Sequence, residues 1–229
     1  MEQIFTVAEK KVVLPYMPTR EYEVEPVGEL PRKWGYELVK RLFDIILSAF
    51  LLLLLAIPMV AIGIAVKLTS PGPALYAQER LGKDGKQIKI YKFRTMVFDS
   101  EIDTIRWSYD NDPRVTPLGR VLRKFHIDEL PQLWDIFRGV LSFVGPRPER
   151  EVFYDAFETY IHGFRERLKV KPGLTGLAQV TGGSPMPPEE KIVCDIEYIR
   201  NRSFALDLKL MIQTVLVVLR KVLGNEERK

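Results

Sequence analysis

Residues 45–66, IILSAFLLLLLAIPMVAIGIAV, decide the architecture of this chain, because 22 consecutive positions carry no charge. At about 1.5 Å per helical residue, the segment is long enough to cross a hydrocarbon core of about 30 Å. Pro58 removes a helical hydrogen bond and clashes with the preceding turn. Lys40 and Arg41 flank one end and Lys67 the other, so the positive-inside rule sets no orientation. A plain span and a helix that turns back at Pro58 are equally consistent with these residues.

The segments on either side of this helix differ from it in composition. Residues 1–39 mix charges with several prolines and predict an arm with little structure of its own. Residues 40–67 are the predicted membrane helix, residues 68–224 a folded domain beside the membrane, and residues 225–229 a tail. From residue 67 to residue 127 the chain has an excess of basic residues, which a surface facing anionic headgroups explains as well as a binding site does.

Composition excludes several classes of protein. A hydrophobic content of 46% and a charged content of 28% are ordinary for a packed domain with a polar surface. The net charge of +4, without zinc-finger spacing or an RNA-binding aromatic pattern, predicts no nucleic-acid partner. Cys194 is the single cysteine, which excludes an intrachain disulfide framework and fits a reducing compartment.

The domain after the membrane segment is predicted to be α+β and mostly helical. ALYAQERLG (74–82) and KQIKIYKFRTM (86–96) flank the turn-like KDG and predict a small β-hairpin. Residues 149–167 are predicted to form an amphipathic helix, and another helix lies near residues 191–201. Residues 206–223 predict a last helix, and three roles stay open for it: packing on the core, lying at the membrane interface, or pairing in a homodimer.

The candidate site lies in residues 123–149, RKFHIDELPQLWDIFRGVLSFVGPRPE. Asp128 and Glu129 come directly before a helix that Pro131 is predicted to begin, where the helix dipole favours negative charge. Arg123 and Arg147 bring fixed cations close in sequence, and acids beside cations indicate phosphoryl-group chemistry. N-terminal capping with surface salt bridges is the alternative explanation.

Further cations lie on or beside the predicted hairpin strands: Arg80, Lys92 and Arg94. A rigid strand holds such side chains in place, so they are candidate substrate-binding residues together with Arg123 and Arg147.

Nine motifs occur in one order: KRLFDIIL (40–47), SPGP (70–73), QERLG (78–82), YKFRTM (91–96), DPRVTPLGRVLRK (112–124), IDELPQLW (127–134), SFVGPRPE (142–149), KPGLTGLAQVTG (171–182) and DIEYIRNRSFALDLKLMIQT (195–214). Together they resemble the bacterial sugar transferase family, the monotopic polyprenyl-phosphate phosphoglycosyl transferases, in its short form. The resemblance implies transfer of phospho-sugar from a UDP-sugar to undecaprenyl phosphate. The products are undecaprenyl-diphospho-sugar and UMP, at the first membrane step of exopolysaccharide, capsule or O-antigen synthesis.

The resemblance also assigns residues and a location. It implies that Asp128 is the nucleophile that forms a covalent aspartyl phospho-sugar, and that Glu129 holds Mg²⁺. It implies a re-entrant helix broken at Pro58, in contact with lipids of the bacterial inner membrane, with the catalytic domain on the cytoplasmic face. Gln179 and Asp195, in the later motifs, complete the candidate substrate-binding residues.

Alternatives to this mechanism stay open. Asp128 can instead act as a general base for direct transfer. A membrane-tethered binding module with a basic face needs the apolar helix and the cations but no acidic pair. The sequence does not separate one UDP-sugar from another. TGGSPMPPEEK (181–191) departs from the family's usual Asn-Gly-Arg motif, so a contact near the sugar or nucleotide is in question.

Overall fold

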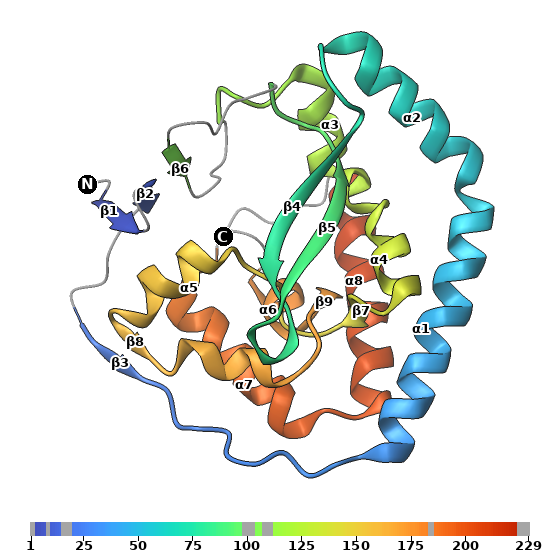
Figure 1. The fold of residues 1–229 in the computed structure, drawn as a ribbon. Helices are drawn as coiled ribbons and strands as arrows, with labels where there is room; N and C mark the ends of the chain where they lie inside the picture. The colour runs from blue at the N-terminus through green and yellow to red at the C-terminus, as the bar shows by residue number, and fades with distance from the viewer. Residues whose placement is uncertain are drawn as a thin grey trace.

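The computed structural model describes residues 3–7, 10–14, 20–97, 104–106, 112–182 and 186–223. Within these ranges the fold is α+β and mostly helical, with small sheets, as predicted. Figure 1 shows the two long helical arms, α1–α2 and α8, beside a body of shorter helices and short strands. The predicted tail at residues 225–229 lies outside the described residues.

The apolar segment forms two helices rather than one. Helix α1 (Trp34–Leu54) and helix α2 (Ala56–Thr69) meet at Leu55 with a bend of 63°. The bend follows from Pro58, which has no N–H for the carbonyl of Leu54 and whose ring crowds that carbonyl. Among the described helices, none is alone long and apolar enough for a membrane crossing, whereas the bent pair meets the criterion together. The pair follows one side of the molecule as an arc (Figure 1).

The predicted β-hairpin is confirmed. Strand β4 (Leu75–Leu81) pairs antiparallel with β5 (Gln87–Phe93) around the short turn η1 (Lys83–Gly85). Asp84 and Gly85 both adopt left-handed backbone angles, with φ of 59° and 72°, which lets the strands reverse in so few residues.

The main core lies between the body helices and a two-stranded parallel sheet. The rings of four almost fully buried residues pack against one another in this core: Phe153, Tyr154, Phe157 and Phe164. The elements around this core are β7 (Ser142–Val144), α5 (Glu151–Glu158), η3 (Phe164–Lys169), β9 (Gly173–Thr175), α6 (Leu177–Thr181), α7 (Pro188–Asn201) and α8 (Phe204–Val222). Strands β7 and β9 approach so closely that a Cβ on Gly173 lies 2.1 Å from the nitrogen of Gly145, so only glycine fits there.

The predicted helix over residues 149–167 is wrong in its length. Helix α5 ends at Glu158, the short strand β8 (Ile161–His162) follows, and Gly163 turns left-handed with φ of 92° before η3 begins. A left-handed residue cannot lie inside a right-handed α-helix, so one helix cannot run through Gly163. The helices predicted near residues 191–201 and 206–223 are present as α7 and α8.

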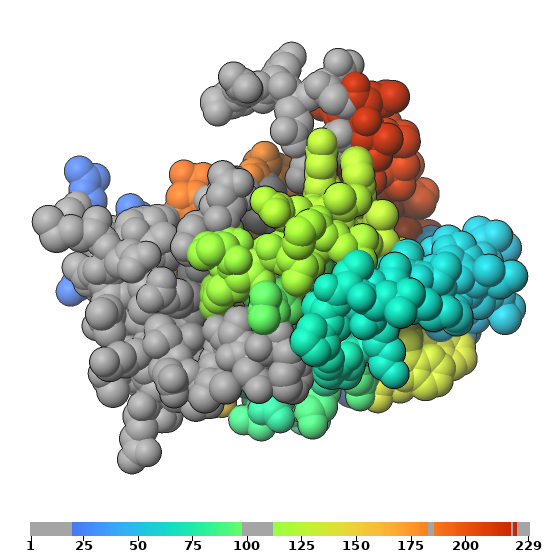
Figure 2. Space-filling model, turned by 90° about the horizontal axis from the view of Figure 1, so that it is seen from above, coloured from blue at the N-terminus to red at the C-terminus, as the bar shows by residue number. Residues whose placement is uncertain are grey.

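A second, smaller core joins the end of the bent helix pair to the body. Val66 of α2, Phe93 of β5 and Leu122 of α3 (Pro117–Lys124) are buried against one another. In Figure 2, which looks down on this end, α2 lies beside the segment of α3. The C-terminal end of α2 is therefore packed on the body.

The N-terminal segment contacts the body more than predicted. Strand β3 (Tyr22–Glu23) pairs parallel with β8, and the Val27 N–H donates to Glu166 at 2.7 Å. Arg202 Nη2 donates to the Pro31 carbonyl at 2.9 Å, and α1 already begins at Trp34. Residues 20–33 thus run along the body as a strap. Upstream, β1 (Gln3–Val7), β2 (Lys10–Leu14) and β6 (Thr104–Arg106) form a sheet in that order.

Apolar side chains are exposed on α4 (Gln132–Arg138) and α8, including Trp134, Phe137, Leu216 and Leu219. An exposed apolar face of this kind fits a lipid or protein partner. That these helices lie at a membrane interface stays a prediction. The pairing of α8 in a homodimer also stays a prediction.

Candidate active site

The acidic pair lies in a short 3₁₀ turn, η2 (Ile127–Glu129), directly before α4. His126 enters the turn with a left-handed φ of 55°, and Pro131 is the residue before the first helical position of α4. The chain therefore changes direction just before the acids and then forms a helix, as the sequence predicts. Asp128 and Glu129 are both buried, with exposures of 7% and 8%.

Glu129 is held between two cations from distant parts of the chain. Lys92, on strand β5, donates to its Oε1 at 3.0 Å, and the Arg147 guanidinium contacts both of its oxygens. Burial alone raises the pKa of Glu129, but Arg147 and Lys92 overcome it and hold that pKa well below the usual value. Glu129 is thus an ionised carboxylate with both oxygens engaged.

Asp128 differs from Glu129 in its hydrogen bonding and in the direction of its pKa shift. No described residue donates a hydrogen bond to its carboxylate. Burial, and next the negative charge of Glu129, raise the pKa of Asp128 to about 6, against the lowering effect of Lys92, Arg123 and Arg147. A buried carboxylate with a perturbed pKa and open oxygens, close to fixed cations, is characteristic of a reactive group.

The structure brings some of the predicted substrate-binding residues to this pair and places others elsewhere. Lys92 and Arg147 bind Glu129, and Arg123 is close enough to lower the pKa of Asp128. Arg123 also donates through Nε to Thr95 at 2.8 Å. Arg80 forms an ion pair with Glu149 at 2.9 Å and donates a hydrogen bond to the Pro148 carbonyl.

Arg94 has a different environment, at the C-terminal end of α2. Its Nη1 donates to the Pro71 carbonyl at 2.6 Å, and its Nη2 to the carbonyl and hydroxyl of Ser70. The last carbonyls of a helix have no partner within the helix. Arg94 Nη2 lies 3.5 Å from one of them, that of Val66 in the last turn of α2. These contacts engage both terminal nitrogens. The substrate-binding role of Arg94 stays a prediction.

Asp195 is buried against Arg167, with an ion pair of 2.5 Å between Oδ2 and Nη2. The same guanidinium donates to the backbone carbonyl of Arg147 at 3.1 Å and therefore supports the residue that holds Glu129. Gln179, in α6, has both amide atoms buried, and neither has a hydrogen-bond partner among the described residues. The substrate-binding roles of Asp195 and Gln179 stay predictions.

Sequence reasoning did not single out Arg167, Glu149 or Lys191, which extend the charged network behind the site. Lys191 lies 3.6 Å from Glu149, and all three side chains are buried. One sequence signal was available: Lys191 and Asp195 are four residues apart and therefore share one face of α7.

The Mg²⁺ that the family resemblance assigns to Glu129 stays a prediction. Within the described ranges, no group of three His, Cys, Asp or Glu side chains gathers for a metal ion. Mg²⁺ commonly takes one or two carboxylates and completes its shell with substrate phosphates and water, which is compatible with this pair. Asp128 offers open oxygens, whereas Glu129 already contacts Lys92 and Arg147.

The chain is similar to known proteins over most of its length. Residues 35–221 match the family model described as bacterial sugar transferase. A UDP-glucose:undecaprenyl-phosphate glucose-1-phosphate transferase of Escherichia coli (strain K12) is 40% identical over 84% of this chain and 42% of its own length. The protein of the same name in Caulobacter vibrioides is 40% identical over 86% of this chain and 75% of its own length.

A third relative is the UDP-N-acetylgalactosamine-undecaprenyl-phosphate N-acetylgalactosaminephosphotransferase of Aeromonas hydrophila. It is 38% identical over 80% of this chain and 44% of its own length. The chain thus spans less than half of the Escherichia coli and Aeromonas proteins. The family model covers the acidic pair, its cations and the bent helices. The chain therefore belongs to the bacterial sugar transferase family.

Proposed function

We propose that this protein transfers phospho-sugar from a UDP-sugar to undecaprenyl phosphate, giving undecaprenyl-diphospho-sugar and UMP. Family membership supports the reaction class, and the names of the relatives supply the substrates. Those names include both glucose and N-acetylgalactosamine, so the sugar stays open. The observation that carries the proposal is the buried Asp128 carboxylate, open among the described residues and surrounded by cations that suit a diphosphate.

The proposed chemistry has two displacements at one phosphorus atom. An Asp128 oxygen attacks the phosphorus that bears the sugar, and the bond from that phosphorus to the bridging oxygen breaks, so UMP leaves. The intermediate is an aspartyl phospho-sugar. A phosphate oxygen of undecaprenyl phosphate then attacks the same phosphorus, and the carboxylate leaves in its original form. Direct transfer with Asp128 as general base is the competing mechanism.

The surrounding residues have distinct parts in this proposal. Arg147, Lys92 and Arg123 complement the negative charge that spreads over the transferring phosphoryl group. Glu129 would hold Mg²⁺, sharing its carboxylate oxygens with Lys92 and Arg147, and the ion would neutralise charge on the donor diphosphate. The buried pair Arg167–Asp195 keeps the Arg147 backbone in position.

The proposed location is the cytoplasmic face of the bacterial inner membrane, at the first membrane step of surface glycan synthesis. The acceptor phosphate lies at the bilayer surface, and the bent pair α1–α2 suits a helix that enters and leaves the same leaflet. Its support is the bend of 63° and the apolar outer surface of both helices.

One experiment tests the reaction. The detergent-solubilised protein is incubated with undecaprenyl phosphate, Mg²⁺ and a panel of UDP-sugars, and UMP release is measured against an Asp128→Asn control. We expect UMP with at least one donor from the wild type and none from the variant. Equal UMP release from both proteins contradicts a catalytic Asp128, and its absence from both favours a membrane-tethered binding module.

A further inference from the structure

The strap, residues 20–33, lies outside the region that matches the family model, which begins at residue 35. In Figure 1 it runs along the lower edge of the body, past β8 and α7, to the start of α1. Three half-buried apolar residues recur every three positions and pack against the main core: Val24, Val27 and Leu30. Between them, main-chain groups of the strap bind charged side chains of the body. The strap thus has both apolar and polar contacts with the body.

The first polar contacts of the strap are with η3. Glu166 accepts the Val27 N–H at 2.7 Å. Lys169 pairs with Glu166 at 2.7 Å and donates to the Gly28 carbonyl at 3.0 Å. A 3₁₀ helix has three residues per turn, so residues 166 and 169 share one face of η3, and the strap binds that face. Arg167 follows Glu166 on another face and is buried, with an exposure of 1%.

The strap also binds the C-terminal end of α7. Arg202 Nη2 donates to the Pro31 carbonyl at 2.9 Å, and Lys33 Nζ donates to the Arg202 carbonyl at 2.9 Å. Arg200 pairs with Glu25 at 2.7 Å. One short segment of chain therefore binds η3 and α7 together.

The same two elements carry the buried ion pair that supports Arg147. Arg167 lies on η3 and Asp195 on α7, and the Arg167 guanidinium also donates to the Arg147 carbonyl. Among the described residues, Nε and Nη1 of Arg167 have no hydrogen-bond partner. A buried ion pair stabilises a fold only when its geometry is good, because both charges have left water. The pair is therefore sensitive to how η3 and α7 are held together.

We propose that the strap is a clamp that holds η3 against α7, and that Glu166 is the positioning residue through which it acts on the active site. With the clamp in place, Arg167 pairs with Asp195 and supports the Arg147 backbone. Arg147 in turn binds Glu129. When the clamp is released, η3 turns, Arg167 loses its contacts, and Arg147 is less well placed for the transferring phosphoryl group. The inference rests on the proposed function, because one of its measurements is UMP release.

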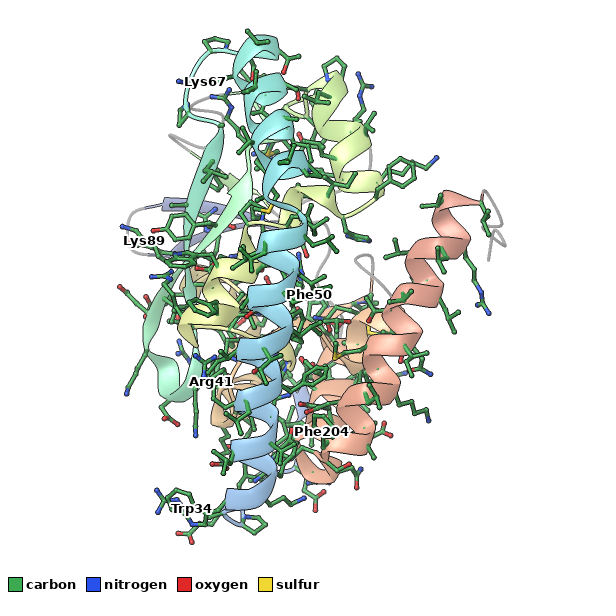
Figure 3. The ribbon with its side chains drawn as sticks, turned by 90° about the vertical axis from the view of Figure 1, so that its right-hand side faces the viewer. Trp34, Arg41, Phe50, Lys67, Lys89 and Phe204 are labelled. Atoms are coloured by element: carbon green, nitrogen blue, oxygen red, sulfur yellow. The ribbon has the colours of Figure 1, made fainter. Side chains whose placement is uncertain are left out.

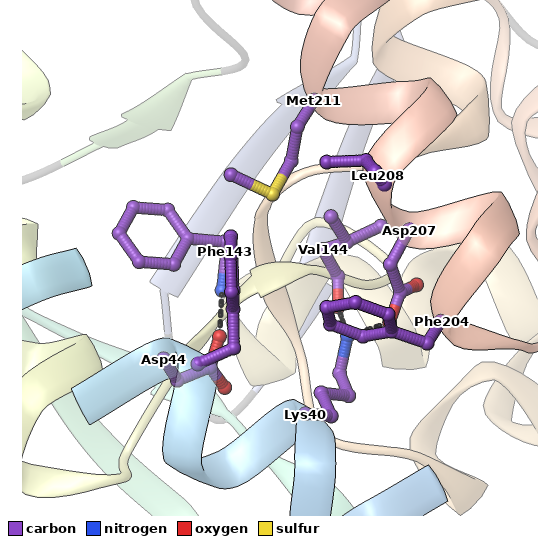
Figure 4. A pocket seen from close by; sticks show the side chains of 9 residues that line it. Lys40, Asp44, Phe143, Val144, Phe204, Asp207, Leu208 and Met211 are labelled. Atoms are coloured by element: carbon purple, nitrogen blue, oxygen red, sulfur yellow. Dashed lines mark hydrogen bonds and ion pairs between the residues drawn. The ribbon is translucent and has the colours of Figure 1, made fainter. Parts of the chain in front are cut away.

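Helix α1, which follows the strap, has contacts of its own with the body. Figure 3 labels Trp34, the first residue of α1 after the strap. Figure 4 shows Lys40 beside Asp207 of α8, at 2.6 Å, and Asp44 bonded to strand β7. We therefore expect α1 to stay docked when the strap is released, so that a strap variant reports on η3 and not on α1.

The competing explanation is that the strap only covers the apolar core. Two substitutions of Val27 separate the explanations. Val27→Pro keeps an apolar side chain but removes the N–H that Glu166 accepts, and Pro26 can adopt the extended conformation that a proline requires of the residue before it. Val27→Ala keeps the N–H and removes apolar contact. The clamp predicts that Val27→Pro impairs the reaction more, whereas simple coverage predicts that Val27→Ala does.

The test measures UMP release by the detergent-solubilised full chain with Mg²⁺, undecaprenyl phosphate and the UDP-sugar that the wild type accepts. Glu166→Ala and Val27→Pro should each lower kcat by about 10- to 100-fold, because a misplacement of about 1 Å can reduce a rate that much. KM for the UDP-sugar should change little, since the loss is in the transition state. Glu166→Gln keeps an acceptor for the Val27 N–H and should retain most of the activity.

Controls separate the clamp from a general loss of charge on η3. Arg165→Gln is the matched control, because Arg165 pairs with Asp155 of α5 and not with the strap, and its kcat should equal that of the wild type. The double variant Glu166→Ala/Val27→Pro should lose little more activity than either single variant, because both substitutions break one contact. A loss in Glu166→Gln as large as that in Glu166→Ala contradicts the clamp.

Hydrogen exchange followed by mass spectrometry gives a second readout that does not depend on activity. The Leu81 N–H donates to the Glu149 carbonyl at 3.0 Å, so its exchange rate reports how firmly the loop after β7 is held. Exchange there should be faster in Glu166→Ala and Val27→Pro than in the wild type and unchanged in the matched control. Val27→Pro serves alone if Glu166→Ala does not accumulate.

The outcomes separate this inference from the proposed function. Wild-type kcat and wild-type exchange in the strap variants, or a larger loss of kcat in Val27→Ala than in Val27→Pro, overturns the clamp. No UMP release from the wild type overturns the proposed function, and the exchange measurement then decides the clamp by itself.

Discussion

Replacing Asp128 by Asn should stabilise the folded protein while removing its proposed activity. Burial and the neighbouring Glu129 raise the pKa of Asp128 from 3.8 to about 6, so its charged form is disfavoured in the folded state. A difference of about 2 pKa units corresponds to about 3 kcal/mol at a pH above both values. Asn has nearly the same shape and no charge, so the variant should recover most of that free energy.

The sign of the pH dependence follows from the raised pKa. The contribution of Asp128 to stability is fully present below about pH 4, where both states are protonated, and it is lost as the pH rises through about 6. The advantage of Asp128→Asn should therefore be near zero at pH 4 and largest at pH 8. For a chain of this size, about 3 kcal/mol corresponds to an increase of about 6–12 °C in melting temperature.

The assay is thermal unfolding in detergent with a chelator present, at pH 4, 6 and 8. Glu79→Gln is the matched control, because the Glu79 side chain is 70% exposed and its loss should change stability by less than about 0.5 kcal/mol. A lower melting temperature for Asp128→Asn at pH 8, or a gain that is the same at pH 4 and pH 8, refutes the assignment of Asp128 as a destabilising buried charge.

Three further predictions concern the same machinery. Glu129→Gln should lower the melting temperature, whereas Asp128→Asn should raise it, because a neutral glutamine side chain at position 129 no longer pairs with Lys92 and Arg147. An unchanged or higher melting temperature contradicts the ion-pair role of Glu129. UDP-sugar alone should release stoichiometric UMP and leave a phospho-sugar adduct on Asp128 in intact-mass spectra, whereas UMP release that strictly requires undecaprenyl phosphate supports direct transfer. Pro58→Leu should convert part of the molecules to a span, which cysteine labelling of a Glu29→Cys variant from the two sides of the membrane measures. Wild-type sidedness in this variant removes Pro58 as the cause of the bend.

Several local features could be predicted from the sequence because they depend on neighbouring residues. The hairpin follows from two alternating runs around KDG, and the bend near Pro58 follows from the missing amide hydrogen of proline. The turn that presents Asp128 and Glu129 before α4 follows from Pro131 and the apolar spacing behind it. The family resemblance rests on the order of motifs, which is also a property of the chain alone.

The environment of each charge was decided only by the tertiary structure. Two adjacent carboxylates are alike in the sequence, yet Glu129 is fixed between Lys92 and Arg147 while Asp128 keeps open oxygens. Those partners are 37 and 18 residues away from Glu129, and which cation reaches which acid depends on how β5 and the loop after β7 pack.

The basic residues beside the apolar segment also have partners that only the tertiary structure reveals. Lys40 and Arg41 look like membrane-flanking charges in the sequence, but they bind Asp207 and the end of α4. Arg94 was predicted from its place on a strand to bind substrate, and the structure adds its contacts to the Pro71 and Ser70 carbonyls after α2, which the sequence did not indicate. The sequence determined which segments are apolar, helical or acidic, since those properties are local. Only the packed structure decided which polar groups meet, because a buried charge takes the partner that the fold brings within reach.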